Sequence, residues 1–75
     1  MYKLCDIRVG SLVRVNELFL KGLMRERMLA LGFTKDALIE VIRKGPKDNL
    51  TVFKIRDTMI ALRKEESSLI LVKGI

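Results

Sequence analysis

This 75-residue chain has no histidine. The side chains left that could bind a metal or act in catalysis are one thiol and scattered carboxylates. Without histidine, they lack the spacing typical of a transition-metal site, so we expect no metal site and keep Cys5 only as a weak candidate ligand. Glu65 and Glu66 are adjacent, and neighbours in a turn do not converge on one substrate bond, so capping of a helical turn is the better interpretation of this pair. The candidate metal ligands are Cys5, Asp6, Glu17, Asp57, Glu65 and Glu66.

The composition also argues against an enzyme. A lone cysteine forms no internal disulfide, and the absence of histidine removes the commonest general base. No glycine-rich loop is followed by Lys and Ser or Thr, so the chain is not a P-loop nucleotide-binding protein. We therefore expect no catalytic residues and no cofactor.

Targeting signals are missing as well. Apolar runs such as 69–72 are far shorter than the roughly 20 residues of a membrane span, so no transmembrane segment is predicted. The first residues lack the apolar stretch of a signal peptide. A cytoplasmic location is expected.

The charge predicts an acidic partner. Fifteen Lys and Arg against nine Asp and Glu give a net charge of +6, which suits nucleic acid, an anionic membrane surface or an acidic protein face. Small barrels that bind single strands use exposed aromatic residues among basic ones. Phe33 and Phe53 fall at inward-facing positions, and Tyr2 and Phe19 are far apart in the sequence. Nucleic acid is therefore not the expected partner.

Hydrophobic periodicity predicts a first strand and a helix. Residues 12–15 read as a strand with Val13 and Val15 facing inward and Arg14 facing solvent. Apolar residues at helical spacing follow, and we expect them to cover one open end of a barrel. Gly32 is placed to end the helix in the left-handed conformation, with Phe33 packing just beyond it. The helical stripe is Leu20, Met24, Met28 and Leu31.

Four further strands are predicted, at 38–43, 50–56, 59–63 and 69–72, with turns at 45–49, 57–58 and 64–68. Five short strands with one helix after the first predict an all-β (small α+β) chain, a single domain over residues 1–75 that forms an SH3-like five-stranded antiparallel barrel. Closing the sheet would remove its unpaired edges. Ile39, Val41 and Arg43 share one face of a mostly buried strand that is apolar on both sides, and Thr51, Phe53 and Ile55 share one face of the next strand. The residues expected to point inward in these strands are Phe53, Ile60, Leu62, Ile70 and Val72.

One flank of the predicted helix combines positive charge with an apolar residue outside the stripe. Lys21, Arg25 and Arg27 form a basic flank that is either a solvated face or a docking surface for acidic protein. Leu29 lies beside Arg25, away from the stripe. It is either covered by the N-terminal segment through Leu4 and Ile7 or free to contact a partner.

The chain resembles the FeoA family over about residues 5 to 73. The resemblance is carried by the order and spacing of several stretches rather than by one motif. These are MRERMLALGFT (24–34), IEVIR (39–43), Pro46, Ile55-Arg56, Leu62-Arg63, Glu65-Glu66 and ILV (70–72). Asp36, Asp48 and Asp57 stand where the family pattern has glycine, and Asp is among the residues that best tolerate the left-handed conformation.

The resemblance implies an SH3-like barrel that assists bacterial ferrous iron uptake. Its implied partner is a FeoB-type membrane GTPase transporter, contacted through the transporter's cytoplasmic GTPase part, and Fe(II) is then the transported ion. Two alternatives remain open, a basic barrel that binds nucleic acid and a transition-metal-responsive module. The oligomeric state also stays open, a monomer included. The predicted partner-binding residues are Lys21, Arg25, Arg27 and Leu29 on the helix flank, with Lys47 and Asn49 on the long hairpin loop.

Overall fold

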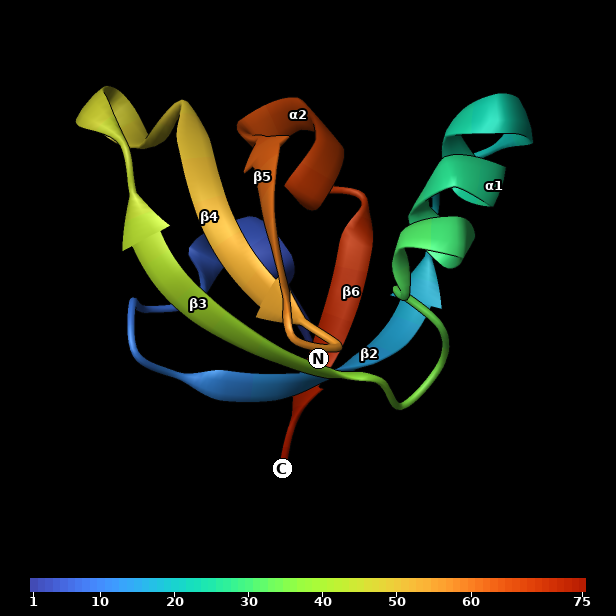
Figure 1. Cartoon of the computed structure of the whole chain (residues 1–75), viewed down its shortest axis with the longest axis horizontal. Coiled ribbons are helices and arrows are strands. Elements are labelled where there is room, and N and C mark those ends of the chain that lie inside the picture. The colour runs from blue at the N-terminus through green and yellow to red at the C-terminus, as the bar shows by residue number, and fades with distance from the viewer.

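The structure is a computed structural model that describes residues 1–47 and 49–75 in full, and Asp48 only through its place in a helical turn. Figure 1 shows a strongly curved sheet with one helix at its flank. The elements in chain order are β1 (Tyr2–Lys3), η1 (Leu4–Asp6), β2 (Leu12–Leu18), α1 (Gly22–Leu31), β3 (Leu38–Lys44), η2 (Pro46–Asp48), β4 (Leu50–Ile55), β5 (Thr58–Arg63), α2 (Lys64–Ser67) and β6 (Ile70–Gly74).

All strand pairs are antiparallel, and the sheet order is β1-β6-β2-β3-β4-β5. The five predicted strands correspond to β2 through β6, and the two-residue β1 is an addition beside β6. The prediction of a small, mostly β chain with a helix after the first long strand is confirmed. The expected closure of the sheet is not confirmed, because among the residues described no strand pairing joins β5 to β1.

The core lies inside the curve of the sheet and follows the two-residue period of the strands. The predicted inward residues are buried, and Leu4 from η1 adds a side chain that is only 1% exposed. Arg43 is exposed, although it was placed on the same face of its strand as the buried Ile39 and Val41. The β3–β4 register shifts between Val41 and Arg43, and this bulge turns the arginine away from the core.

The helix differs from its predicted role as a cover. Leu20 is buried but precedes α1, Met28 is buried, and Met24 is partly buried against the core. The prediction for Leu31 is wrong, because its side chain is 37% exposed. At 3.6 residues per turn, Leu31 lies about 60° around the helix from Met28, off the narrow side that faces the core. Figure 1 shows α1 beside the sheet, past the end of β2.

The end of α1 agrees with its prediction. Gly32 has φ 115°, its N–H donates to the Leu29 carbonyl, and the Phe33 N–H donates to the Met28 carbonyl at 3.0 Å. Phe33 is fully buried. The helix therefore stops at a left-handed glycine and is fixed there by the next side chain.

Two of the three aspartates at glycine positions adopt the expected conformation. Asp36 has φ 67° and Asp57 has φ 63°, whereas the expectation for Asp48 lies outside the residues described in full. The β4–β5 turn is made by Arg56 and Asp57 rather than by residues 57–58, because Thr58 pairs with Ile55. Both turn residues have positive φ, which suits a two-residue hairpin and its strand twist.

Candidate partner-binding surface

The predicted partner-binding residues lie on two separate surfaces. The helix flank belongs to α1 and its N-terminal boundary, and Lys47 and Asn49 lie in and just after η2. Figure 1 shows α1 on one side and the turn between β3 and β4 on the opposite side, with β4, β5 and β6 between them. The two patches therefore cannot form a single contact with a small partner surface.

The Arg25 side chain makes a hydrogen bond within the chain. Its Nη1 donates to the carbonyl oxygen of Leu18 at 2.9 Å, which ties α1 to the end of β2. Arg25 and Leu29 line a cavity of about 280 Å³ with Phe33 and Lys35. This contact gives Arg25 a structural role whether or not a partner docks.

Leu29 has a 36% exposed side chain. The N-terminal segment does not cover it, since Leu4 is buried in the core and η1 packs against α2 and β6. The first of the two interpretations of Leu29 is therefore wrong. The side chain is free to contact another molecule.

The most exposed apolar residue of α1 was missed. Leu23 is 80% exposed and lies one turn before Arg27. We call Leu23, Arg27 and Ala30, all exposed, the outer helix face. The same count of helical angles that set Leu29 apart identifies Leu23 once the helix is known to begin at Gly22. Apolar residues therefore occupy both the core side and the solvent side of α1.

The cations near α1 form no ion pair with any carboxylate that the structure describes in full. Among the residues described in full, the one ion pair joins Lys73 and Asp36. Lys21 and Arg27 are both exposed, and Lys21 lies at the N-terminal boundary of α1. An acidic surface could pair with both without breaking an internal contact.

The hairpin-loop residues serve the fold as well. The Asn49 N–H donates to the Pro46 carbonyl at 3.3 Å, and the Asn49 carbonyl accepts from the Lys64 N–H at 3.2 Å. Lys47 is exposed and has φ 57°. Asn49 therefore links η2 to the start of α2, whereas Lys47 presents an exposed charged side chain.

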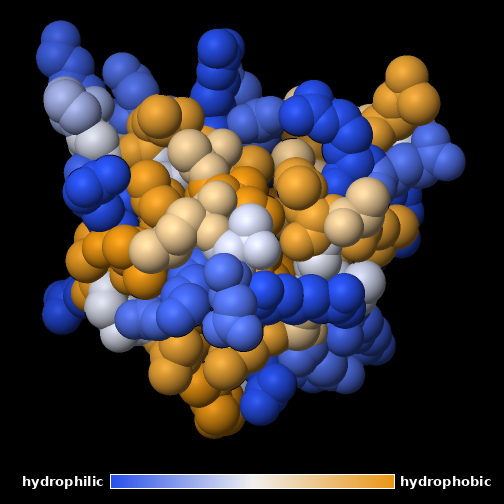
Figure 2. Space-filling model, viewed as in Figure 1, coloured by the Kyte–Doolittle hydropathy of each residue, from blue (hydrophilic) through white to orange (hydrophobic). Residues whose placement is uncertain are grey.

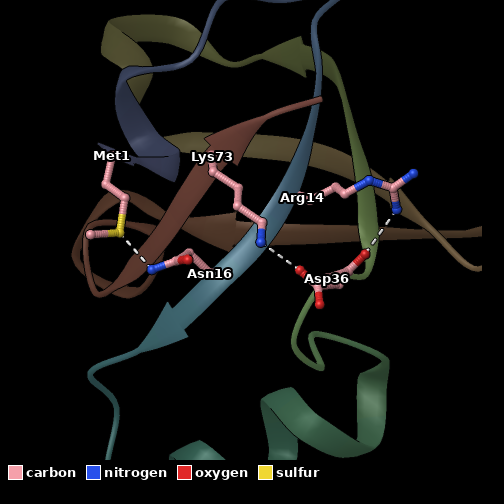
Figure 3. Close-up of polar contacts among 5 residues, drawn as sticks. All are labelled: Met1, Arg14, Asn16, Asp36 and Lys73. Atoms are coloured by element: carbon pink, nitrogen blue, oxygen red, sulfur yellow. Dashed lines mark hydrogen bonds and ion pairs between the residues drawn. The ribbon is translucent and has the colours of Figure 1, made fainter.

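The loop after α1 is held by two cations. Lys73 Nζ lies 2.7 Å from Asp36 Oδ1, and Arg14 Nη1 donates to the Asp36 carbonyl oxygen at 2.9 Å. Figure 3 shows both side chains converging on Asp36 from β6 and β2. The hydrogen bond and charge of Lys73 lower the pKa of Asp36 below its ordinary value. In the same view, Asn16 donates to the Met1 sulfur.

The remaining reactive groups do not converge. Burial raises the pKa of the Cys5 thiol, and neighbouring Asp6 raises it further, so the thiol is protonated at neutral pH and would have to lose a proton to bind a metal. Among the residues described in full, no three Cys, Asp or Glu side chains gather as metal ligands. The Glu66 carboxylate accepts the Arg63 N–H at 2.8 Å, which confirms a capping role.

The fold and these surfaces define a small SH3-like domain that carries an inserted helix with an apolar and basic exterior. The model of the FeoA domain matches residues 2–74, so the chain belongs to the FeoA family and the predicted resemblance is confirmed. No curated protein sequence matches the chain. No helix in the part described is long and apolar enough to cross a membrane.

Solved structures support the same assignment. Iron(II) transport protein A from Clostridium thermocellum is 32% identical with a TM-score of 0.91, and the match covers 97% of this chain but 45% of that one. FeoA from Chlorobium tepidum is 22% identical with a TM-score of 0.91, covering 97% and 70%. FeoA from Stenotrophomonas maltophilia in complex with zinc, described as an SH3 domain protein, is 22% identical with a TM-score of 0.83, covering 97% and 91%. The present chain thus spans less than half the length of the Clostridium chain.

Proposed function

We propose that this chain is a non-catalytic accessory protein of ferrous iron uptake that docks in the cytoplasm on the GTPase part of a FeoB-type transporter. Membership of the FeoA family, which has an iron(II) transport protein among its solved members, supports the iron-uptake role. Fe(II) is then cargo of the transporter rather than a cofactor of this chain.

The docking proposal rests on exposed apolar residues of α1 that lie near cations with no ion-pair partner in the part of the chain described. Leu23 and Leu29 are exposed, and Lys21 and Arg27 lie on the same helix or at its boundary. An apolar contact surrounded by positive charge suits an acidic protein face, since the charges favour the encounter and apolar burial contributes affinity.

The test is iron uptake through a co-expressed FeoB-type transporter. We expect Leu23→Gln and Arg27→Glu to reduce transporter-dependent 55Fe(II) accumulation, and Leu29→Gln to reduce it as well. Arg8→Glu is the matched control, because Arg8 is exposed on the N-terminal segment and carries the same charge change. Equal uptake by all four variants at equal protein level contradicts docking through α1.

A further inference from the structure

The outer edge of β5 has backbone groups with no hydrogen-bond partner among the residues that the structure describes. β5 is the last strand of the sheet and pairs only with β4. Ile55 and Thr58 flank the two-residue turn, and hydrogen-bonded and non-bonded pairs alternate along the ladder from there. The N–H and C=O groups of Met59 and Ala61 therefore point away from β4. Among the residues described, no backbone bond from another segment reaches them.

This edge lacks the usual protection against strand addition. Exposed edges are commonly short, bulged, covered or occupied by Lys or Pro. The opposite edge, β1, has two residues, whereas β5 has six in a continuous register with no Lys or Pro, and its one charged residue is Arg63 at the far end. Met59 is 59% exposed and Ala61 is also exposed. Figure 2 shows hydrophobic surface over β5 that continues toward α1.

The charge beside the turn indicates what could pair with this edge. Lys35, Lys54 and Arg56 line one groove of about 610 Å³ beside the β4–β5 turn, which residues of β2, β3 and the loop after α1 complete. None of them has a carboxylate within ion-pair distance among the residues described, whereas Asp36 in the same groove is already paired with Lys73. Figure 2 shows the corresponding hydrophilic band over the β4–β5 turn and the loop after α1. Glu40 and Asp57 are the other acidic groups of the groove, so with Asp36 neutralised by Lys73 three cations remain against two carboxylates.

We infer that β5 accepts an extended segment of a partner protein as an additional strand, apolar at alternate positions and acidic at the end that meets Lys35, Lys54 and Arg56. The free groups of Met59 and Ala61 supply the main-chain hydrogen bonds, and the groove supplies the charge contact. A second copy of this chain is disfavoured as the occupant because each copy carries +6. The inference deepens the proposed function and rests on it, since it names the kind of segment through which a partner would dock.

The test uses an isotope-labelled sample of the full chain and a synthetic peptide, acetyl-Glu-Asp-Val-Thr-Val-Thr-Val-amide. We expect the peptide to slow hydrogen exchange at the Met59 and Ala61 amides by about tenfold or more, because those amides become hydrogen-bonded. A peptide with Lys-Lys in place of Glu-Asp should bind more weakly, and one with Pro at the central Val should not protect the edge.

Two variants and one control locate the contact. Ala61→Pro removes an outward N–H at an edge position where proline keeps the β4 ladder intact, and we expect it to weaken peptide binding at least about tenfold. Met59→Glu is the second variant, and we expect it to weaken binding because a carboxylate on this edge repels the acidic end of the peptide. Val9→Glu, at an exposed apolar residue of the N-terminal segment, is the matched control and should bind the peptide normally.

Three results overturn the inference. The first is no protection of either amide at about 1 mM peptide, the weak end of measurable affinity. The second is protection confined to α1. The third is protection that rises with protein concentration in the absence of peptide, which would assign the edge to a second copy. Each leaves the iron-uptake test of the helix variants unaffected, so the failure of this inference and that of the proposed function are separable.

Discussion

Arg56 lies across Gly32: a Cβ added to Gly32 would come within 3.1 Å of Arg56 Cδ and 3.4 Å of its Nε. The guanidinium continues past the glycine, and Nη2 donates to Thr34 Oγ1 at 3.2 Å. The β4–β5 turn is thereby joined to the end of α1, two segments that are 24 residues apart in the sequence.

We predict that Gly32→Ala destabilises the chain by about 1–2 kcal/mol, the cost of a side chain in the left-handed region. Its φ of 115° carries this cost regardless of space, and the added Cβ also forces Arg56 to move. Urea unfolding of Gly32→Ala, Arg56→Ala and the double variant measures both effects. The double variant should lose less than the sum of the single losses. Strict additivity would show that the contact between Arg56 and Gly32 carries no energy.

A substitution in the β4–β5 turn should raise the stability of the chain rather than lower it. Asp57 has φ 63°, and glycine adopts this conformation without the steric cost of a Cβ. We therefore expect Asp57→Gly to be stabilising by some tenths up to about 1 kcal/mol, since glycine's larger unfolded-state entropy offsets part of the gain. Thermal unfolding measures the effect, and Thr58→Gly is the control. Thr58 is a strand residue, so glycine there should destabilise the chain. A lower melting temperature for Asp57→Gly contradicts strain at this turn.

Much of the fold could be predicted from the sequence because strand burial repeats every two residues. Val13, Val15, Phe53 and Ile55 occupy the core as that period requires. Arg43 departed from it because a bulge adds a residue on one strand, which depends on the pairing partner and leaves no local signal.

The surfaces were less predictable than the core. Leu23 and Leu31 are exposed because α1 presents only a narrow side to the core, and that contact depends on where the sheet ends. The free edge of β5 depends on strand order, which alternation within one strand does not specify. Arg25 and Asn49 were predicted as partner contacts from their charge and loop position, and their bonds within the chain could be seen only in three dimensions.

Asp36 gives a pH dependence whose sign follows from its lowered pKa. A carboxyl whose pKa is lower in the folded state than in the unfolded state adds stability that is present above the unfolded-state pKa and is lost as the pH falls through the folded-state pKa. We expect wild type to exceed Asp36→Asn in stability at pH 7 and to match it in strong acid. Asn keeps tolerance for φ 67°. Urea unfolding across the acidic range measures the difference.

The same pair should respond to salt. The side chains of Lys73 and Asp36 are 41% and 59% exposed, so their attraction is screened by solvent and ions. The stability difference at pH 7 should therefore shrink in 1 M NaCl. A difference that persists unchanged in acid would show that the amide disturbs the loop by another route.

Arg25 and Arg27 separate a structural role from a docking role on one helix. Arg25 donates to the Leu18 carbonyl, so Arg25→Gln should cost about 0.5–1.5 kcal/mol of unfolding free energy, the usual net contribution of such a bond. Arg27 is exposed, and Arg27→Gln should stay within about 0.5 kcal/mol of wild type. In iron uptake the order should reverse once protein levels are equalised, with Arg27→Gln the more impaired. Equal stability of the two variants would contradict the anchoring role of Arg25. Equal uptake by the two variants would contradict the docking role of Arg27.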